Sequence, residues 1–120
     1  KMDEMKMNAS QTTTRSKMIF EQLIRLVGEY HTKYRNVGFY ADKLCITSKY
    51  LSSLIKGITG KTALEIIEEY AIAECKALLL STRMTIQQIS DELNFPSQSV
   101  FGKYFKRVTG MSPTEYRKNR

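Results

Sequence analysis

Apolar residues recur along this chain at the three- and four-residue spacing of amphipathic helices, and no stretch alternates apolar and polar residues as a strand would. Two stripes place apolar side chains at i, i+3, i+4 and i+7: Leu51, Leu54, Ile55 and Ile58, and then Phe101, Tyr104, Phe105 and Val108. Each stripe ends at a Thr-Gly pair, where glycine suits the left-handed residue that closes a helix. Extended along the chain, the pattern predicts an all-α fold of seven helices.

The two stripes belong to a unit that occurs twice. Equivalent residues lie 49 positions apart before a central turn, as Leu44 and Leu93 do, and 50 apart after it, as Gly60 and Gly110 do. One additional residue in the second turn accounts for the change. Each copy has a short helix, a polar turn and a longer helix, which predicts two helix-turn-helix units of the homeodomain-like kind. Two such units on one chain suggest two DNA contacts one helical turn apart.

The chain is expected to divide into residues 1–16, a flexible tail or inter-domain linker rich in Ser, Thr, Asn and Gln, and a domain over 17–120. Met2, Met5 and Met7 leave open a short amphipathic helix within the tail. A first helix is expected from near Arg15–Lys17 to about His31. Its apolar face consists of Met18, Leu23, Leu26, Val27 and Tyr30. The further elements are a first helix-turn-helix at about 39–60, a linker helix at about 62–80, a second helix-turn-helix at about 86–110 and a final helix at about 112–120.

The linker helix has an apolar seam that we expect to be buried: Leu64, Ile67, Ala71, Ile72, Cys75, Leu78 and Leu79. Eighteen residues at about 1.5 Å of rise each span roughly 27 Å. Successive major grooves on one face of DNA lie about 34 Å apart, so this helix suits a rigid spacer. Its four glutamates suit a surface that faces away from DNA.

Local signals agree with these boundaries. Three capping boxes, each a Ser or Thr followed three residues later by Glu or Gln, mark helix starts: Thr62 with Glu65, Thr85 with Gln88, and Ser112 with Glu115. The small residues Ala41 and Ser90 stand where the two helices of each unit are expected to cross closely. Asn94 suits a left-handed backbone in the second turn.

Charge is divided unevenly along the chain. Residues 17–60 and residues 81–120 each hold seven basic and three acidic residues, whereas residues 61–80 hold two basic and four acidic ones. The positive charge therefore lies on the two repeated units, as expected of a protein that grips a polyanion at two places.

Removing the apolar stripe from each longer helix leaves a face without acidic residues. These faces carry Ser48, Lys49, Ser52, Ser53 and Lys56 in the first unit, and Gln98, Ser99, Gly102, Lys103 and Lys106 in the second. Short polar and long cationic side chains suit close approach to base edges and phosphates. Gly102 favours the same interpretation. A glycine in the middle of a helix costs about 1 kcal/mol relative to alanine, and its lack of a side chain would leave room for a DNA atom to approach the helix. The alternative for such faces is ordinary solvation, which the duplication and the charge distribution disfavour.

Other classes of function have little support. Cys45 and Cys75 are too few and too isolated for a disulfide framework or a zinc site, and both fall on predicted apolar helix faces. His31, the only histidine, is expected at a helix end or on the surface. With no catalytic pair, phosphate loop or metal-spaced cluster, we expect no enzyme, cofactor or metal.

Most aromatic residues lie on the buried stripes, which disfavours RNA stacking. A helical module that contacts RNA polymerase or another regulator without reading bases stays open as the alternative.

The second unit contains the run Ile89-Ser90-Asp91-Glu92-Leu93-Asn94-Phe95-Pro96-Ser97, followed by Phe101-x-x-x-Phe105-Lys106-Arg107-x-Thr109-Gly110-Met111-Ser112-Pro113-x-x-Tyr116-Arg117. With these runs, the stretch from about Arg25 to Arg120 resembles the DNA-binding domain of AraC/XylS-type bacterial transcription regulators. The resemblance implies two helix-turn-helix units joined by a long helix, with one recognition helix of each in adjacent major grooves. It implies a transcription regulator, and more specifically an activator.

The resemblance also carries site residues over to this sequence. It assigns base reading to Lys49, Ser52 and Ser53 in the first unit and to Gln98, Ser99, Val100 and Lys103 in the second. We assign phosphate contacts to Ser48, Lys56, Ser97, Lys106 and Arg107. Asn94 departs from the glycine that is usual in the family, and Ser52 and Ser53 are shorter than its usual side chains. Tyr50 is left undecided between packing and a DNA-backbone contact.

The expected partners are double-stranded DNA, RNA polymerase and an effector or signalling domain that would precede residue 1. We expect no membrane contact, a monomeric fragment and a cytoplasmic, nucleoid-associated location.

Overall fold

The computed structural model describes the backbone of residues 2–119 and the side chains of residues 14–119. Over that part the chain forms seven helices and no strand, which confirms the predicted fold class. The helices are α1 (Met2–Tyr30), α2 (Val37–Lys43), α3 (Ser48–Thr59), α4 (Ala63–Ser81), α5 (Ile86–Glu92), α6 (Gln98–Thr109) and α7 (Pro113–Lys118). None of the described helices has both the length and the apolar character that a membrane crossing would require.

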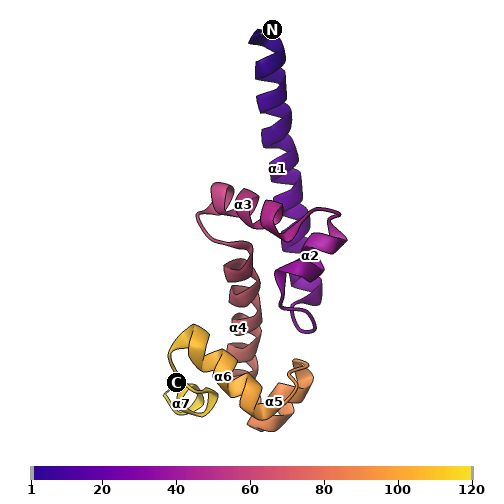
Figure 1. Ribbon diagram of the computed structural model, residues 1–120. Helices are drawn as coiled ribbons and strands as arrows, with labels where there is room; N and C mark the ends of the chain where they lie inside the picture. Colours follow the sequence, from indigo (N-terminus) through magenta and orange to yellow (C-terminus); the bar gives the residue numbers. More distant parts are fainter. Residues whose placement is uncertain (1, 120) are drawn as a thin grey trace.

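Helix α4 is shared by two helical units (Figure 1). Helices α1, α2 and α3 pack on its N-terminal half, where the core includes Leu51 of α3 and Ile67 of α4. Helices α5, α6 and α7 pack on its C-terminal half, where the core includes Cys75 of α4 and both Phe101 and Phe105 of α6. Each unit therefore has its own hydrophobic core, and α4 contributes one side of both.

The predicted capping boxes and glycine helix ends are confirmed. All three capping boxes form, with Thr62, Thr85 and Ser112 as the first residues of the three pairs. The backbone N–H of Thr62 donates to Glu65 at 3.0 Å and lowers the pKa of that carboxyl group. Gly60 and Gly110 close α3 and α6 in the left-handed region, with φ of 79° and 86°. These caps fix where α4, α5 and α7 begin and where α3 and α6 end.

The first helix begins earlier than predicted, at Met2 and not near Arg15, and it ends at Tyr30. Residues 2–27 contain no glycine or proline, and the Ser, Thr, Asn and Gln residues that suggested a tail each cost a helix only about 0.5 kcal/mol. In Figure 1 the N-terminal part of α1 extends beyond the other helices. The side chains of Met2, Met5 and Met7 lie outside the described residues, and the role of residues 1–16 as a linker stays a prediction.

Two predicted apolar faces are confirmed along most of their length, and each is wrong at one residue near its N-terminal end. On α1, Ile19 is buried in place of Met18, which is 54% exposed. On α4, Ala63 and Ile66 are buried, whereas Leu64 is 41% exposed. Periodicity gives the middle of an apolar face but leaves the residues at its edge and end undecided, and there the packing of α1 and α4 against α3 decides which side chain is buried.

The two turns share an unusual backbone conformation. Cys45 and Asn94, which are equivalent in the repeat, have φ of 59° and 61° and are the two non-glycine residues with positive φ in the described chain. This confirms the expectation for Asn94. It corrects the prediction for Cys45, which is exposed in the turn after α2 and does not lie on an apolar helix face. Cys75 is buried as predicted, and burial raises the pKa of its thiol to about 12.

Ala41 and Ser90 are both buried where the short and long helices of their units meet, as predicted. They differ in one respect. The hydroxyl oxygen of Ser90 has no hydrogen-bond partner among the described residues. A buried hydroxyl without a partner is destabilising, since it has lost its water without replacement.

We expect the substitution Ser90→Ala to raise the free energy of unfolding by about 1 kcal/mol, because it removes this hydroxyl. The reciprocal Ala41→Ser should lower it by about 1–2 kcal/mol, since it buries a new hydroxyl at the equivalent place. Urea unfolding of both variants measures the two changes. A loss of stability in Ser90→Ala would mean that the hydroxyl has a partner, such as an internal water.

Candidate nucleic-acid interface

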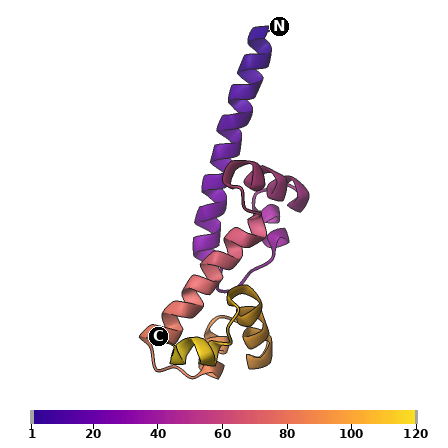
Figure 2. The ribbon, with the colours of Figure 1, turned by 90° about the vertical axis from the view of Figure 1, so that its left-hand side faces the viewer.

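The longer helices of the two units, α3 and α6, lie on the same side of α4, one nearer each of its ends (Figure 2). Each turns its apolar stripe inward, with Leu51 and Ile55 of α3 and Phe101 and Phe105 of α6 almost fully buried. The opposite face of each helix is therefore open to solvent on one side of the molecule. This arrangement suits a ligand that passes along both helices.

Helix α6 exposes most of its predicted contact residues. Gln98, Ser99, Lys103 and Lys106 are exposed, and the side chain of Val100 is 43% exposed. Ser97, just before the helix, is also exposed, and its hydroxyl oxygen accepts a hydrogen bond from the Val100 backbone at 3.1 Å. Its hydroxyl hydrogen remains available to an acceptor such as a phosphate.

Helix α3 presents the matching residues. Ser48, Lys49, Ser53 and Lys56 are exposed, and Ser52 is half-buried. The N-cap of this helix is Thr47, whose hydroxyl accepts from the backbone N–H of Tyr50 at 3.0 Å, so Ser48 is not used as the cap. Tyr50 is 43% exposed at the position equivalent to Val100. Of the two roles left undecided for Tyr50, this exposure favours a contact with the DNA backbone over packing.

None of the lysines of these two faces takes part in an ion pair of the described residues, although Lys56 and Lys106 are near enough to Glu65 and Glu115 to help lower the pKa of those carboxyl groups. The ion pairs of the described residues are His31–Glu74, Lys61–Glu69 and Arg107–Glu68, and in each of them the carboxylate comes from α4. Lys49, Lys56, Lys103 and Lys106 belong to none of these pairs. Their charge is therefore available to an anionic ligand.

Arg107 differs from the other predicted phosphate contacts. Its Nη2 donates to Glu68 of α4 at 2.6 Å, and this hydrogen bond raises the pKa of the guanidinium. A guanidinium held in this way connects α6 to α4. A DNA contact by Arg107 stays a prediction, and it would require the guanidinium to share its donors with Glu68.

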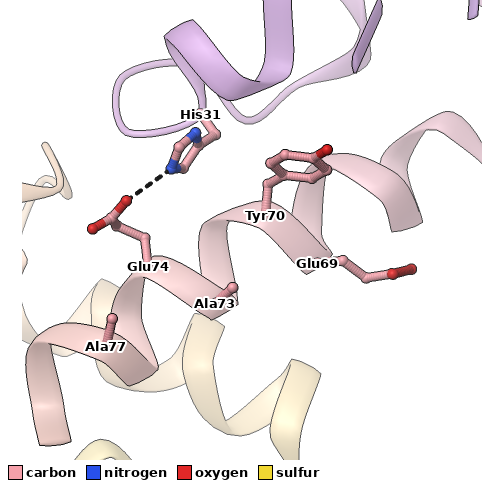
Figure 3. A pocket seen from close by; sticks show the side chains of 6 residues that line it. All are labelled: His31, Glu69, Tyr70, Ala73, Glu74 and Ala77. Carbon is pink, nitrogen blue, oxygen red and sulfur yellow. Dashed lines mark hydrogen bonds and ion pairs between the residues drawn. The ribbon is translucent and has the colours of Figure 1, made fainter. Parts of the chain in front are cut away.

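The hollow between the end of α1 and α4 has a different character (Figure 3). His31, Tyr70, Glu69 and Glu74 line it, and Figure 3 shows the Glu69 side chain directed away from the His31–Glu74 contact. The lining contains two glutamates and neither Lys nor Arg, which disfavours nucleic acid, so we do not include this hollow in the interface. The described side chains also contain no cluster of His, Cys, Asp and Glu that could hold a metal ion.

Sequence patterns missed two arginines that organise the domain. Arg35, between α1 and α2, donates hydrogen bonds to the turn of the second unit, and Arg117 of α7 donates to the backbone around the end of α4. Both act on backbone carbonyl oxygens, which carry no side-chain signal in a sequence. An isolated arginine in a basic chain is also compatible with a contact to an anionic ligand, so its sequence position alone does not indicate a structural role.

Gly102 lies on the open face of α6, and a Cβ added there would meet no atom within 4 Å apart from its chain neighbours and the adjacent backbone of its own helix. We expect Gly102→Ala to raise the free energy of unfolding by about 1 kcal/mol through helix propensity, and to weaken DNA binding by filling the space next to a base or phosphate. Gly57→Ala in α3 is the matched control, because its Cβ is equally free of contacts and it lies outside the predicted contact set. It should give the same gain in stability with unchanged affinity. Equal affinities for both variants would show that DNA does not approach Gly102 closely.

Comparison with known proteins agrees with this geometry. A family model described as a helix-turn-helix domain matches residues 40–119. The arabinose operon regulatory protein of Escherichia coli (strain K12) is 33% identical over 82 residues, which cover 68% of this chain and 28% of that protein. The chain thus spans under a third of that relative.

Two solved structures share the fold. The C-terminal domain of AraT, a response regulator from Geobacillus stearothermophilus, is 27% identical with a TM-score of 0.67, over 82% of this chain and 85% of that one. A xylose-binding transcription activator is 25% identical with a TM-score of 0.67, over 85% of this chain and 27% of that one. Since the family model covers most of the chain, the chain belongs to this helix-turn-helix family and is a DNA-binding domain of an AraC/XylS-type transcription regulator, not an enzyme.

Proposed function

We propose that the domain binds one DNA duplex with α3 and α6 in successive major grooves. The observation that carries this proposal is the position of the two helices on one side of α4 (Figure 2), with four exposed lysines on their open faces that belong to none of the described ion pairs. Helix α4 extends from Ala63 to Ser81, a length of roughly 28 Å at about 1.5 Å per residue, which suits grooves about 34 Å apart.

Within that complex we propose a division of roles. Lys49, Ser52 and Ser53 of α3 and Gln98, Ser99, Val100 and Lys103 of α6 read base edges, while Ser48, Lys56, Ser97, Lys106 and Arg107 contact phosphates. Glutamine can pair with adenine and lysine with guanine, whereas serine hydroxyls accept either base type. The second unit should therefore define its half of the site more strongly than the first.

We further propose that the domain acts within a longer regulator, with an effector or signalling domain before residue 1 that is joined through residues 1–16. The relatives named above are an operon regulator, a response regulator and a transcription activator, which supports a role in activation and a contact with RNA polymerase. Chromosomal DNA as the ligand implies a cytoplasmic location on the nucleoid. The fragment itself should bind as a monomer, because one chain supplies both reading helices.

Salt dependence tests the DNA contact. If about five phosphates are neutralised, the logarithm of the association constant should fall with the logarithm of salt concentration at a slope of about −4 to −5. Fluorescence anisotropy with a labelled duplex, selected from random DNA, measures this slope between low and moderate salt. An association constant independent of salt, or no binding to any duplex at low salt, would refute the proposed function.

A further inference from the structure

The loop between α1 and α2 is bonded directly to the turn of the second unit through Arg35. Its Nη1 donates to the carbonyl oxygens of Thr32 at 3.0 Å and of Leu93 at 2.9 Å. Its Nη2 donates to the carbonyl oxygen of Asn94 at 3.4 Å, and the guanidinium lies over the ring of Phe95, 3.9 Å from its centroid. One side chain thus contacts residues on both sides of the boundary between the two units.

The carbonyl groups explain why a cation is held there. Thr32 follows the C-terminus of α1, and Leu93 and Asn94 follow the C-terminus of α5, where backbone carbonyls lack helical partners and carry partial negative charge. Burial lowers the pKa of Arg35 from its ordinary value, but a guanidinium stays charged in proteins. Arg35 belongs to none of the described ion pairs. Its described hydrogen bonds all go to backbone carbonyl oxygens.

Asn94 of the second turn donates a hydrogen bond back to the loop after α1. Its side-chain Nδ2 donates to the carbonyl oxygen of Thr32 at 3.1 Å, while its backbone has a φ of 61°. Glycine would adopt that backbone conformation more readily, but it has no side-chain amide to donate to Thr32. Among the described residues, the hydrogen bonds that run directly between the two units all come from Arg35 and Asn94.

The same loop region is also attached to α4. Nε2 of His31 lies 3.2 Å from Oε1 of Glu74 (Figure 3). Its Nδ1 lies 2.7 Å from the carbonyl oxygen of Val27. The loop that contains Thr32 and Arg35 is therefore attached to the shared helix through His31 and to the second turn through Arg35.

We propose that these contacts of Arg35 and Asn94, which we call the clasp, hold the two helix-turn-helix units at one angle and thereby make the domain select DNA sites by the spacing between their halves. The inference rests on the proposed function. Each unit has its own core on α4, and the clasp adds the direct connection between them. Two linked reading helices bind together only when the link presents them at the separation of their half-sites, so a stiffer link discriminates more sharply between spacings.

Asn94→Gly is the gentlest test, because it removes the amide while easing the left-handed backbone, and Arg35→Met removes the guanidinium. Cys45→Gly is the matched control, since it relaxes the equivalent turn without touching the clasp. Affinities are measured for a selected site and for versions lengthened or shortened by one base pair. In both clasp variants the preference of the native spacing over the altered ones should fall by about threefold to thirtyfold, whereas Cys45→Gly keeps the native preference. An undiminished preference in folded Asn94→Gly would overturn the proposal.

A readout without DNA separates the clasp from the proposed function. In a Cys45→Gly background, spin labels at Ser53→Cys and Lys103→Cys report the distance between the open faces of α3 and α6, while Cys75 is buried with a raised thiol pKa and stays unlabelled. The distance distribution should be narrow and should broaden with Asn94→Gly. A narrow distribution in both proteins would overturn the clasp. Broadening in the labelled protein, together with a failure of the unlabelled domain with its native Ser53 and Lys103 to bind any duplex, would support the clasp and refute the DNA complex.

Discussion

Replacement of Arg117 by methionine is expected to lower the free energy of unfolding by about 2–4 kcal/mol. Arg117 Nε donates to the carbonyl oxygen of Leu79 at 2.9 Å, and Nη1 donates to that of Met84 at 2.7 Å. Helix α4 has no basic residue in its last turn, so this guanidinium supplies both the donors and the positive charge that its C-terminus lacks. Its loss should loosen α7 and the second unit, which urea unfolding would detect.

The matched control is Arg83→Met, in the loop that Arg117 spans. Arg83 is exposed and has no hydrogen bond or ion pair among the described residues, so its replacement should change stability by no more than about 0.5 kcal/mol. Arg117→Lys should fall between the two, because one ammonium group cannot reproduce donors directed at two carbonyls. If Arg117→Met were as stable as Arg83→Met, the backbone contacts of Arg117 would contribute little.

Removal of the Lys103 side chain is expected to have the largest effect on DNA recognition. If Lys103 reads a guanine, Lys103→Ala should weaken binding to the preferred site by about 1–3 kcal/mol, or about 5- to 150-fold, and should relax the preference at one base pair. Competition binding with every single-base variant of the selected site measures both changes.

Lys106→Ala on the same face of α6 is the control for charge. Loss of a phosphate contact should weaken binding to all sequences alike and reduce the salt slope by about 1. Identical, sequence-independent losses from Lys103→Ala and Lys106→Ala would show that the reading face of α6 has been assigned wrongly. Both lysines are exposed and belong to none of the described ion pairs, so neither substitution should disturb the fold.

The fold was predictable because local signals and the repeat agree along most of the chain. Capping boxes at Thr62, Thr85 and Ser112 mark helix starts, and Gly60 and Gly110 mark helix ends, so these boundaries follow from short-range chemistry. The start of α1 did not follow, because a polar stretch without glycine or proline is compatible with helix or tail, and propensity alone does not decide between them.

The sequence predicts which faces of the recognition helices are exposed better than it predicts the contacts that individual side chains make. Subtracting the apolar stripe identified the exposed residues of α6 because period and burial are directly linked. The ion pair between Arg107 and Glu68 depends on the angle at which α6 crosses α4, which no local pattern encodes. The same holds for Arg35 and Asn94, whose partners are backbone atoms about 60 residues away.

The claim on which the proposed function rests is that one chain places two recognition helices in successive major grooves of one duplex. Hydroxyl-radical footprinting of the domain on a selected site, with native mass spectrometry of the same complex, measures this directly. The expected result is one chain per duplex, with two protected stretches about 10 base pairs apart on one face and the stronger sequence preference in the half bound by α6. A single protected stretch, or a palindromic site that requires two chains, would contradict it.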